Sequence, residues 1–193
     1  MHKAGLRNMK GIVFTEFLEM VEKTLSPEIA DLVITRSKVP SNGVYTAVGT
    51  YPHAEMVALV TTLAEITSTD TADLLRAFGR HLFGRFLKFY PQFFEGLSNS
   101  FDFLETVDNH VHVEVRKLYP DAELPSFTCV RPDAKTLVMT YTSRRSFADL
   151  AHGLIEGAHA HWREEVDVER KDSPALESGS EFDEARFTLT LRG

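Results

Sequence analysis

Residues 126–145 read SFTCVRPDAKTLVMTYTSRR, and within them the hydrophobic repeat shortens from about 3.6 residues to about 2. Two runs of β-branched and aromatic residues, Ser126–Val130 and Thr136–Tyr141, flank the turn residues Arg131-Pro132-Asp133. Alternating runs on both sides of such a turn are typical of a β-hairpin. This stretch therefore predicts that a helical chain gives way to an antiparallel sheet.

Upstream of the hairpin, apolar residues recur every three or four positions, which predicts helices. Ser26-Pro27 and Thr69-Asp70 supply N-capping residues for two of them. The segment Pro40–Thr50, rich in Ser, Asn, Gly and Thr, predicts a loop. The predicted helices are Met9–Lys23, Pro27–Val39, Tyr51–Ile66, a long one from the cap at 69–70 to Pro91, and Phe101–Tyr119.

Downstream of the hairpin, the spacing predicts one more helix, Phe147–Arg163, and two alternating strands, Glu165–Arg170 and Arg186–Arg192. The polar segment Lys171–Ser180 predicts the loop between these strands. A helical N-terminal part followed by an antiparallel sheet with one inserted helix is an α+β fold. The order of elements excludes the βαβ alternation of a parallel sheet.

The composition is that of a globular protein, with 193 residues of which 43% are hydrophobic and 25% charged. A single cysteine, Cys129, excludes an internal disulfide and a Cys-rich metal site. The formal net charge of −7 argues against a nucleic-acid binder. Neither a membrane-spanning run nor the apolar core of a signal peptide is found, so we expect a cytoplasmic protein with no membrane partner.

Met9 is a second methionine that stands just before the first amphipathic stretch. We therefore expect residues 1–8 to be a disordered extension or a misassigned start. Residues 9–193 are expected to form a single domain, which at this length can bury a sizeable core.

Tyr141, Ser143 and Arg145 stand two residues apart where the second strand of the hairpin ends. In an extended chain their side chains project to one face, where a phenol, a hydroxyl and a guanidinium offer hydrogen bonds to carboxylate oxygens. Three converging donors suggest a site for an anionic ligand. On spacing alone, however, a strand end with a solvated arginine is the favoured interpretation.

Four of the eight histidines form two pairs, His110/His112 and His159/His161. Side chains two residues apart on a helix point about 200° away from each other, so neither pair can chelate one metal ion. Phosphate-binding glycine loops and the GxSxG, CxxC and HExxH motifs are missing from the sequence. The common catalytic and metal-binding classes that these motifs mark are therefore excluded.

The segment YTSRR at residues 141–145 fits the Y-x-S-x-R motif of haem–nitric oxide/oxygen binding (H-NOX) domains, bacterial relatives of the haem domain of soluble guanylate cyclase. Three further segments are similar to this family in the same order: MKGIVFTEFLEMVE from Met9, HVHVEVRKLYPDAELPSFTC from His110, and GLIEG at residues 153–157. The resemblance covers the chain from Met9 onward. It implies a haem held between the helical part and the sheet, and its α+β fold agrees with the hydrophobic pattern.

The resemblance implies ferrous haem b with one axial histidine, seven residues before a Tyr-Pro pair and thirteen before a proline, and both counts give His112. On a helical wheel His110 and His112 each lie about a quarter-turn off the apolar stripe, on opposite sides. The residues alone therefore leave both histidines open. A single axial imidazole leaves the sixth iron position free for a gas.

By the same resemblance, Tyr141, Ser143 and Arg145 hold the haem propionates, and Pro125 presses on the macrocycle. A turn proline before a strand is an equal interpretation of Pro125. Six apolar residues match positions that line the family's haem pocket, and each is also a plausible core residue: Val13, Phe17, Leu82, Phe86, Leu150 and Leu154.

Family members that bind O₂ stably carry a tyrosine at the position of Leu150, and its hydroxyl donates to the bound gas. Leu150 and Leu82 have no donor, so bound O₂ would gain no polar stabilisation, whereas NO and CO need little. The resemblance therefore implies a protein that binds NO and CO and discriminates against O₂. A tyrosine from elsewhere (Tyr45, Tyr51 or Tyr90) reaching the pocket is the alternative.

These implications describe a nitric oxide sensor, not an enzyme, that regulates a separate protein through release of His112. The resemblance gives a histidine kinase as the first candidate partner and a cyclic-di-GMP enzyme as the second. A haem peroxidase is the alternative from the enzyme class and needs a distal acid–base residue. A haem carrier or interaction module is a third interpretation. Cys129 is either a small buried strand residue or a thiol open to nitrosylation or oxidation.

Overall fold

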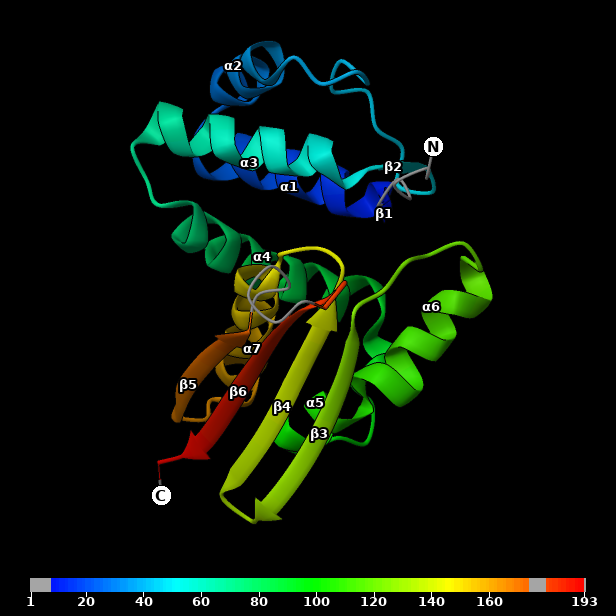
Figure 1. Cartoon of the computed structure of the whole chain (residues 1–193), viewed down its shortest axis with the longest axis vertical. Coiled ribbons are helices and arrows are strands. Elements are labelled where there is room, and N and C mark those ends of the chain that lie inside the picture. Colours follow the sequence, from blue (N-terminus) through cyan, green and yellow to red (C-terminus); the bar gives the residue numbers. More distant parts are fainter. Residues whose placement is uncertain (1–7, 174–179, 193) are drawn as a thin grey trace.

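The structure, a computed structural model, describes residues 8–173 and 180–192 (Figure 1). A layer of helices lies at one end of the molecule and a sheet at the other, and α4 runs between them. The elements in chain order are β1 (Asn8–Lys10), α1 (Gly11–Thr24), α2 (Pro27–Ser37), β2 (Thr50–Pro52), α3 (His53–Thr67), α4 (Thr71–Phe89), the 3₁₀ turn η1 (Pro91–Phe93), α5 (Ser100–Thr106), the π-helical turn η2 (Val107–Val111), α6 (His112–Leu118), β3 (Ser126–Asp133), β4 (Thr136–Ser143), α7 (Ala148–Trp162), β5 (Val166–Ser173) and β6 (Asp183–Leu191).

The main sheet has four antiparallel strands in the order β3-β4-β6-β5. Helix α7, inserted between β4 and β5, packs on it, because Ala151 and Ile155 share one core with Leu137, Met139 and the buried residues of β6. A chain with helices first and an antiparallel sheet last confirms the α+β prediction. None of the described helices has the length and apolar character needed to cross a membrane.

The strands are longer than the hydrophobic pattern predicts. β3 runs through the expected turn to Asp133, with a register irregularity between Val130 and Asp133, and the chain turns at residues 134–135 instead. β5 extends to Ser173, because its polar end pairs with β6 as far as Glu184. Polar residues on an exposed strand face carry no hydrophobic signal, so the sequence assigned them to a loop.

Two short strands went undetected in the sequence. β1 pairs antiparallel with β2, Asn8 opposite Pro52 and Lys10 opposite Thr50. The sequence predicts the N-terminal extension and a helix start for β1, and the end of a loop and a helix start for β2. A pairing between residues so far apart in the chain leaves no local pattern. Asn8 therefore belongs to the folded part, whereas residues 1–7 of the predicted extension lie outside the described residues.

The predicted helix Phe101–Tyr119 is interrupted. α5 ends at Thr106, a π-helical turn occupies Val107–Val111, and α6 starts at His112. A π turn closes its hydrogen bonds over five residues and so holds one residue more than an α turn. Everything after it is rotated by about 100° relative to a continuous α-helix.

Helices α4 and α7 cross at a close contact between glycines. A Cβ atom on Gly79 would lie 2.4 Å from the Leu150 carbonyl oxygen, and one on Gly153 would lie 2.1 Å from that of Arg76. Only glycine permits this approach at either position. The crossing places Leu82 and Phe86, one and two turns after Gly79, close to Leu150 and Leu154 on α7.

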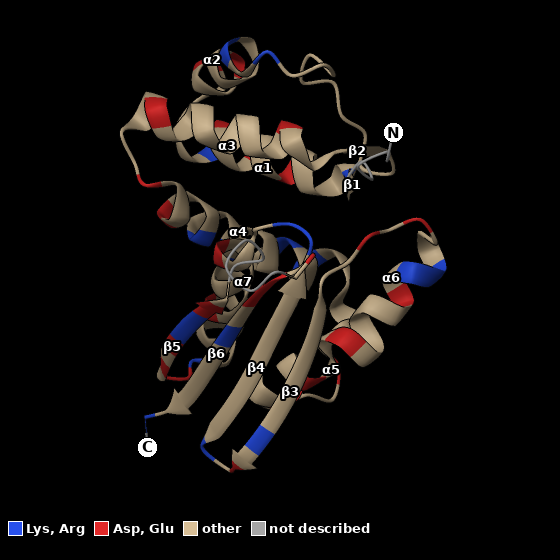
Figure 2. Ribbon diagram, in the orientation of Figure 1, with Lys and Arg blue, Asp and Glu red and all other residues tan. Residues whose placement is uncertain are grey.

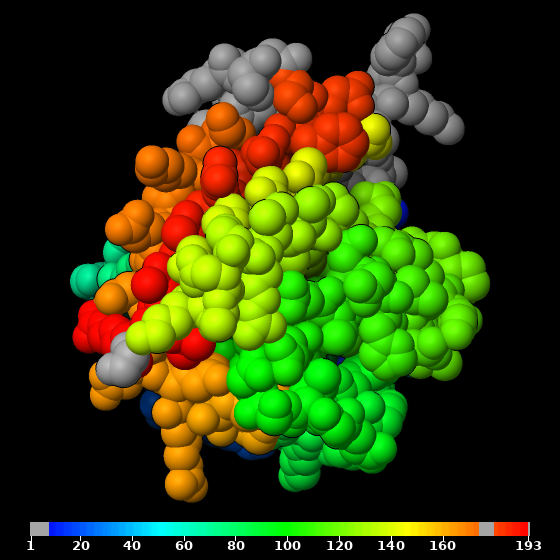
Figure 3. All heavy atoms as spheres, turned by 90° about the horizontal axis from the view of Figure 1, so that it is seen from below, coloured from blue at the N-terminus to red at the C-terminus, as the bar shows by residue number. Residues whose placement is uncertain are grey.

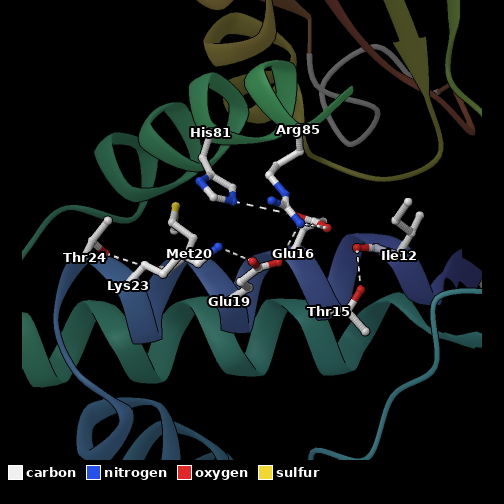
Figure 4. A network of polar contacts seen from close by, with 9 residues as sticks. All are labelled: Ile12, Thr15, Glu16, Glu19, Met20, Lys23, Thr24, His81 and Arg85. Carbon is white, nitrogen blue, oxygen red and sulfur yellow. Dashed lines mark hydrogen bonds and ion pairs between the residues drawn. The ribbon is translucent and has the colours of Figure 1, made fainter. Parts of the chain in front are cut away.

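Helix α1 is tied to α4 by a cluster of charged side chains (Figure 4). Arg85 on α4 donates through Nε to Glu16 Oε2 at 2.5 Å and through Nη2 to Glu16 Oε1 at 3.2 Å and Glu19 Oε2 at 2.9 Å. His81 Nε2 lies 3.6 Å from Glu16 Oε2. Glu16 is 5% exposed, so this cluster fixes the two helices through a buried carboxylate.

Charged residues are spread along the helices and along β5, while β4 carries none along its length (Figure 2). Seen from below, the segment of α5 and α6 lies directly against β3 (Figure 3). The interior near β4 is therefore apolar and is closed on one side by α5 and α6.

Candidate functional site

A cavity of about 270 Å³ lies where the helical layer meets the sheet. Residues of α1, α4 and α7 line it, together with residues of η2, α6, β4 and the segment that joins α6 to β3. Figure 1 shows these elements converging near the upper ends of β3 and β4. The lining is apolar apart from a few groups, among them His112 and the side chains at the end of β4.

His112 lines the cavity, and its side chain is 12% exposed. His110 is exposed and lies outside the lining, and its ring packs edge-on against Phe93 at 5.8 Å. The π turn explains the difference. The extra residue rotates α6 about the helix axis by about 100°. This rotation places His112 on the same side of the helix as Leu104 and Val107, which also line the cavity.

Burial lowers the pKa of the His112 imidazole, and the neighbouring Asp108 opposes this effect. The ring is therefore mainly neutral near pH 7, the form in which histidine binds metals. Its Nδ1 lies 3.4 Å from Asp108 Oδ1. Asp108 was missed in the sequence, although its spacing of four residues from His112 was a signal for it.

Tyr141, Ser143 and Arg145 are all buried and all line the cavity. The hydroxyl of Tyr141 donates to the Arg145 carbonyl oxygen at 2.8 Å, and Ser143 Oγ accepts the Arg145 amide at 3.1 Å. The structure brings the three residues together as predicted, but in these contacts the phenol and hydroxyl shape the turn after β4. Of the three side chains, only the Arg145 guanidinium carries a charge.

The Arg145 guanidinium is held by two backbone carbonyls. Nη1 donates to the Asn8 oxygen at 2.6 Å and Nη2 to the Glu123 oxygen. Arg145 is 7% exposed, and burial lowers the pKa of its guanidinium. Its hydrogen-bond partners are neutral carbonyls, and the nearby Glu123 carboxylate is exposed, so the buried cation gains energy from an anionic ligand.

Five of the six apolar candidates line the cavity: Val13, Leu82, Phe86, Leu150 and Leu154. Phe17 does not, which corrects the prediction. It is fully buried one turn beyond Val13, and its ring packs edge-on against Phe78 at 5.2 Å. These two rings fill the space between α1 and α4 next to the cavity. Pro125 lines the cavity just before β3.

Of the three tyrosines that could bring a hydrogen-bond donor to the pocket, one lines the cavity and two do not. Tyr45 donates to Glu55 Oε2 at 2.8 Å and Tyr51 accepts the Thr46 amide at 2.9 Å, and neither lines the cavity. Tyr90 does line it, with its ring stacked on Phe93 at 5.8 Å. Tyr90 is therefore the one member of the trio in contact with the site.

Among the described residues, neither a second metal site nor a reactive thiol is found. In residues 8–173 and 180–192, no three His, Cys, Asp or Glu side chains gather as a metal site. Burial raises the pKa of the Cys129 thiol to about 11. A thiol in that state has little thiolate and hence low reactivity.

Comparison with known proteins decides the family. A family model described as haem-NO-binding matches residues 10–170. The chain belongs to the H-NOX family. The Fe(II) unliganded H-NOX protein from K. algicida shares 36% sequence identity with this H-NOX chain, with 96% of this chain and 97% of that one covered and a TM-score of 0.85.

Two more distant H-NOX structures share the fold. The S. oneidensis protein in its Fe(II)NO ligation state is 22% identical, with 96% of this chain and 100% of that one covered and a TM-score of 0.84. A mutant of the T. tengcongensis H-NOX protein is 21% identical, with 96% of this chain and 98% of that one covered and a TM-score of 0.84. No curated protein gives a significant match. The H-NOX domain described here thus has a haem-binding, gas-sensor fold.

The cavity residues of this H-NOX domain fit a haem by their chemistry. A porphyrin has an apolar face, anionic propionates and an iron that takes a nitrogen ligand. The cavity offers an apolar lining, a buried guanidinium hydrogen-bonded to backbone carbonyls, and one neutral imidazole. His112 is the one histidine among the described residues that line it.

Proposed function

We propose that this H-NOX domain is a nitric oxide sensor that holds ferrous haem b through Nε2 of His112. When bound, the haem supplies an iron whose free position takes NO or CO. The observation that carries the proposal is the cavity itself, which combines a buried neutral imidazole with apolar walls. Arg145 is the proposed partner of the propionates, with Tyr141 and Ser143 fixing the turn that presents it, and Pro125 the proposed contact of the macrocycle.

The apolar walls support selectivity for NO and CO over O₂. Leu82, Phe86, Leu150 and Leu154 contribute no hydrogen-bond donor to the cavity. Tyr90 also lines it, with its ring stacked on Phe93, so the proposed selectivity requires that the Tyr90 hydroxyl does not reach the bound gas. Polar O₂ binds weakly without such a donor, whereas NO binds tightly without help. A peroxidase needs an acid–base residue facing the bound oxidant, and these four side chains supply none.

We propose that release of His112 carries the signal. His112 is the first residue of α6, and α6 exposes two apolar residues, Val113 at 38% and Leu118 at 64%. A helix freed at His112 changes the apolar surface that it shows to a partner. The proposed partner is a histidine kinase, or a cyclic-di-GMP enzyme as second choice, acting with the sensor in the cytoplasm, and the sensor itself is not an enzyme.

The test replaces each of the two neighbouring histidines in turn. We expect His112→Gly to lose the axial ligand, so that the purified protein keeps haem and its ferrous spectrum only when imidazole is added. His110→Gly is the matched control, since His110 is exposed, and it should bind haem like the wild type. Normal ligation in His112→Gly without imidazole, or loss of ligation in His110→Gly, would overturn the assignment.

A further inference from the structure

Asp108 holds a position between the candidate ligand and the sheet. It lies in the π turn, four residues before His112, and its Oδ1 is 3.4 Å from His112 Nδ1. The same oxygen accepts the backbone amide of Phe127 on β3 at 3.2 Å. One carboxylate therefore joins the imidazole, the π turn and the first strand of the sheet.

The contact favours one tautomer of His112, which also forms a hydrogen bond with the Pro125 backbone. A carboxylate oxygen only accepts hydrogen bonds, so a neutral imidazole facing Asp108 carries its proton on Nδ1. The other nitrogen, Nε2, is then left with a lone pair. In the Nδ1–H tautomer, the metal-binding lone pair is on Nε2, away from Asp108.

The carboxylate is anchored independently of His112. The Phe127 amide is fixed by the strand, and the Phe127 ring packs against His112 at 5.7 Å and against Tyr141 at 5.6 Å. Asp108 thus takes its position from β3 as well as from its own helix. An acceptor fixed at both ends holds the ring in one orientation, which lowers the entropy lost when the ring binds a metal.

We propose that Asp108 is a positioning residue for His112, fixing its Nδ1–H tautomer and strengthening it as a metal ligand. This inference rests on the proposed function, because it assigns Asp108 a part in how firmly His112 holds iron and how readily NO releases it. A charged acceptor behind an imidazole raises its basicity as a ligand. Asp108 sets the threshold for release without touching the gas.

The first test uses the cofactor-free protein. Long-range ¹H–¹⁵N correlation of the histidine rings should show His112 mainly as the Nδ1–H tautomer. Asp108→Ala should shift His112 toward the Nε2–H tautomer that predominates in free histidine, and Asp108→Asn, which keeps an acceptor oxygen, should shift it less. Glu114→Ala is the matched control, because Glu114 lies on α6 but pairs with Lys117 at 2.6 Å. An unchanged His112 tautomer in folded Asp108→Ala would overturn the inference.

The second test uses the haem-loaded protein. In Asp108→Ala the iron–histidine stretching band should move to lower frequency, and haem should transfer to an apo-globin acceptor about 10-fold faster than in the wild type. Glu114→Ala should match the wild type in both. If the His112 tautomer depends on Asp108 but the wild-type protein binds no haem, the proposed function is contradicted and only the positioning of the imidazole by Asp108 stands. If the protein binds haem but Asp108→Ala leaves the iron–histidine band unmoved, the inference about Asp108 is contradicted and the proposed function stands.

Discussion

Leu150 shows how one side chain sets the gas preference proposed for the cavity. It lines the wall formed by α7, next to Leu154 and across from the α4 residues Leu82 and Phe86. None of these four side chains carries a polar hydrogen. The selectivity proposed here therefore depends on what is missing from the wall, and it is reversed by adding a single hydroxyl.

We expect Leu150→Tyr to stabilise an O₂ complex, because the phenol brings a donor into an otherwise apolar wall. The measurement is the absorption spectrum of the reduced, haem-loaded variant in air. Leu150→Phe is the control, with the same ring and no hydroxyl, and should behave like the wild type. Equal O₂ affinity in the Tyr and Phe variants would show that the hydroxyl does not reach the gas.

His159 is a buried residue whose titration affects stability rather than the site. Its Nδ1 and Ser100 Oγ are 2.7 Å apart, which joins α7 to the start of α5. Burial lowers the pKa of His159 to about 4, against the opposing effect of Glu156. The unfolded chain takes up this proton near pH 6.5, so the stability is complete above that pH and falls as the pH drops toward 4.

The predicted loss between pH 7 and pH 5 is on the order of 2 kcal/mol from His159. Urea unfolding of the cofactor-free protein at the two pH values measures it. His159→Gln cannot take up a proton at either pH, so its free energy of unfolding should fall less over the same interval. A drop as large as that of the wild type would show that other groups cause the acid sensitivity.

At the scale of elements, the π turn marks where prediction from the sequence reaches its limit. The apolar spacing of Phe101–Tyr119 correctly predicted a helix. A helical wheel, however, assumes the same rotation of about 100° for every residue. The extra residue in Val107–Val111 rotates His112 by about 100°, which is why the wheel set both histidines off the stripe. The hydrogen bond between Asp108 in η2 and the Phe127 amide in β3 joins two elements, and no local sequence pattern predicts it.

Similar reasons explain the other differences. Phe17 has the spacing of a cavity residue, but whether a buried ring faces a cavity or another ring depends on its partner, here Phe78. The short strands β1 and β2 pair over a long stretch of chain. The hairpin, α7 and the order of elements were predictable because their signals are local. For Arg145 the spacing suggested an anion site and the Y-x-S-x-R resemblance implied its role, but neither shows that its guanidinium is held by the backbone carbonyls of Asn8 and Glu123.

The ion pair between α1 and α4 gives a prediction at the same scale. Arg85→Met leaves the Glu16 carboxylate buried without its cation, so we expect the melting temperature to fall by several degrees. Replacing both residues, Glu16→Leu with Arg85→Met, should restore part of the loss, because no unpaired charge remains. Arg80→Met is the control, since Arg80 pairs at the surface with Glu156. A double variant less stable than Arg85→Met would contradict this interpretation.

At the scale of the whole molecule, the cavity lies at the junction of two parts. The helices α1–α3 meet the rest of the chain mainly across α4, and the sheet part is joined by the packing of α7 on α4. A group in the cavity touches α1 on one part and α6 and β4 on the other. A change at a group bound there can therefore displace elements of both parts. This agrees with the proposed sensor, whose signal is a change of its surface.

The most direct measurement is the absorption spectrum of haem-loaded protein, reduced with dithionite, desalted, and followed first in air and then with NO. We expect a five-coordinate ferrous spectrum that air leaves unchanged and that NO converts to the spectrum of a five-coordinate NO complex. That result requires a single axial histidine, a wall without a donor, and release of the histidine by NO. A stable O₂ spectrum in air, or a protein that takes up no haem, would contradict the central claim.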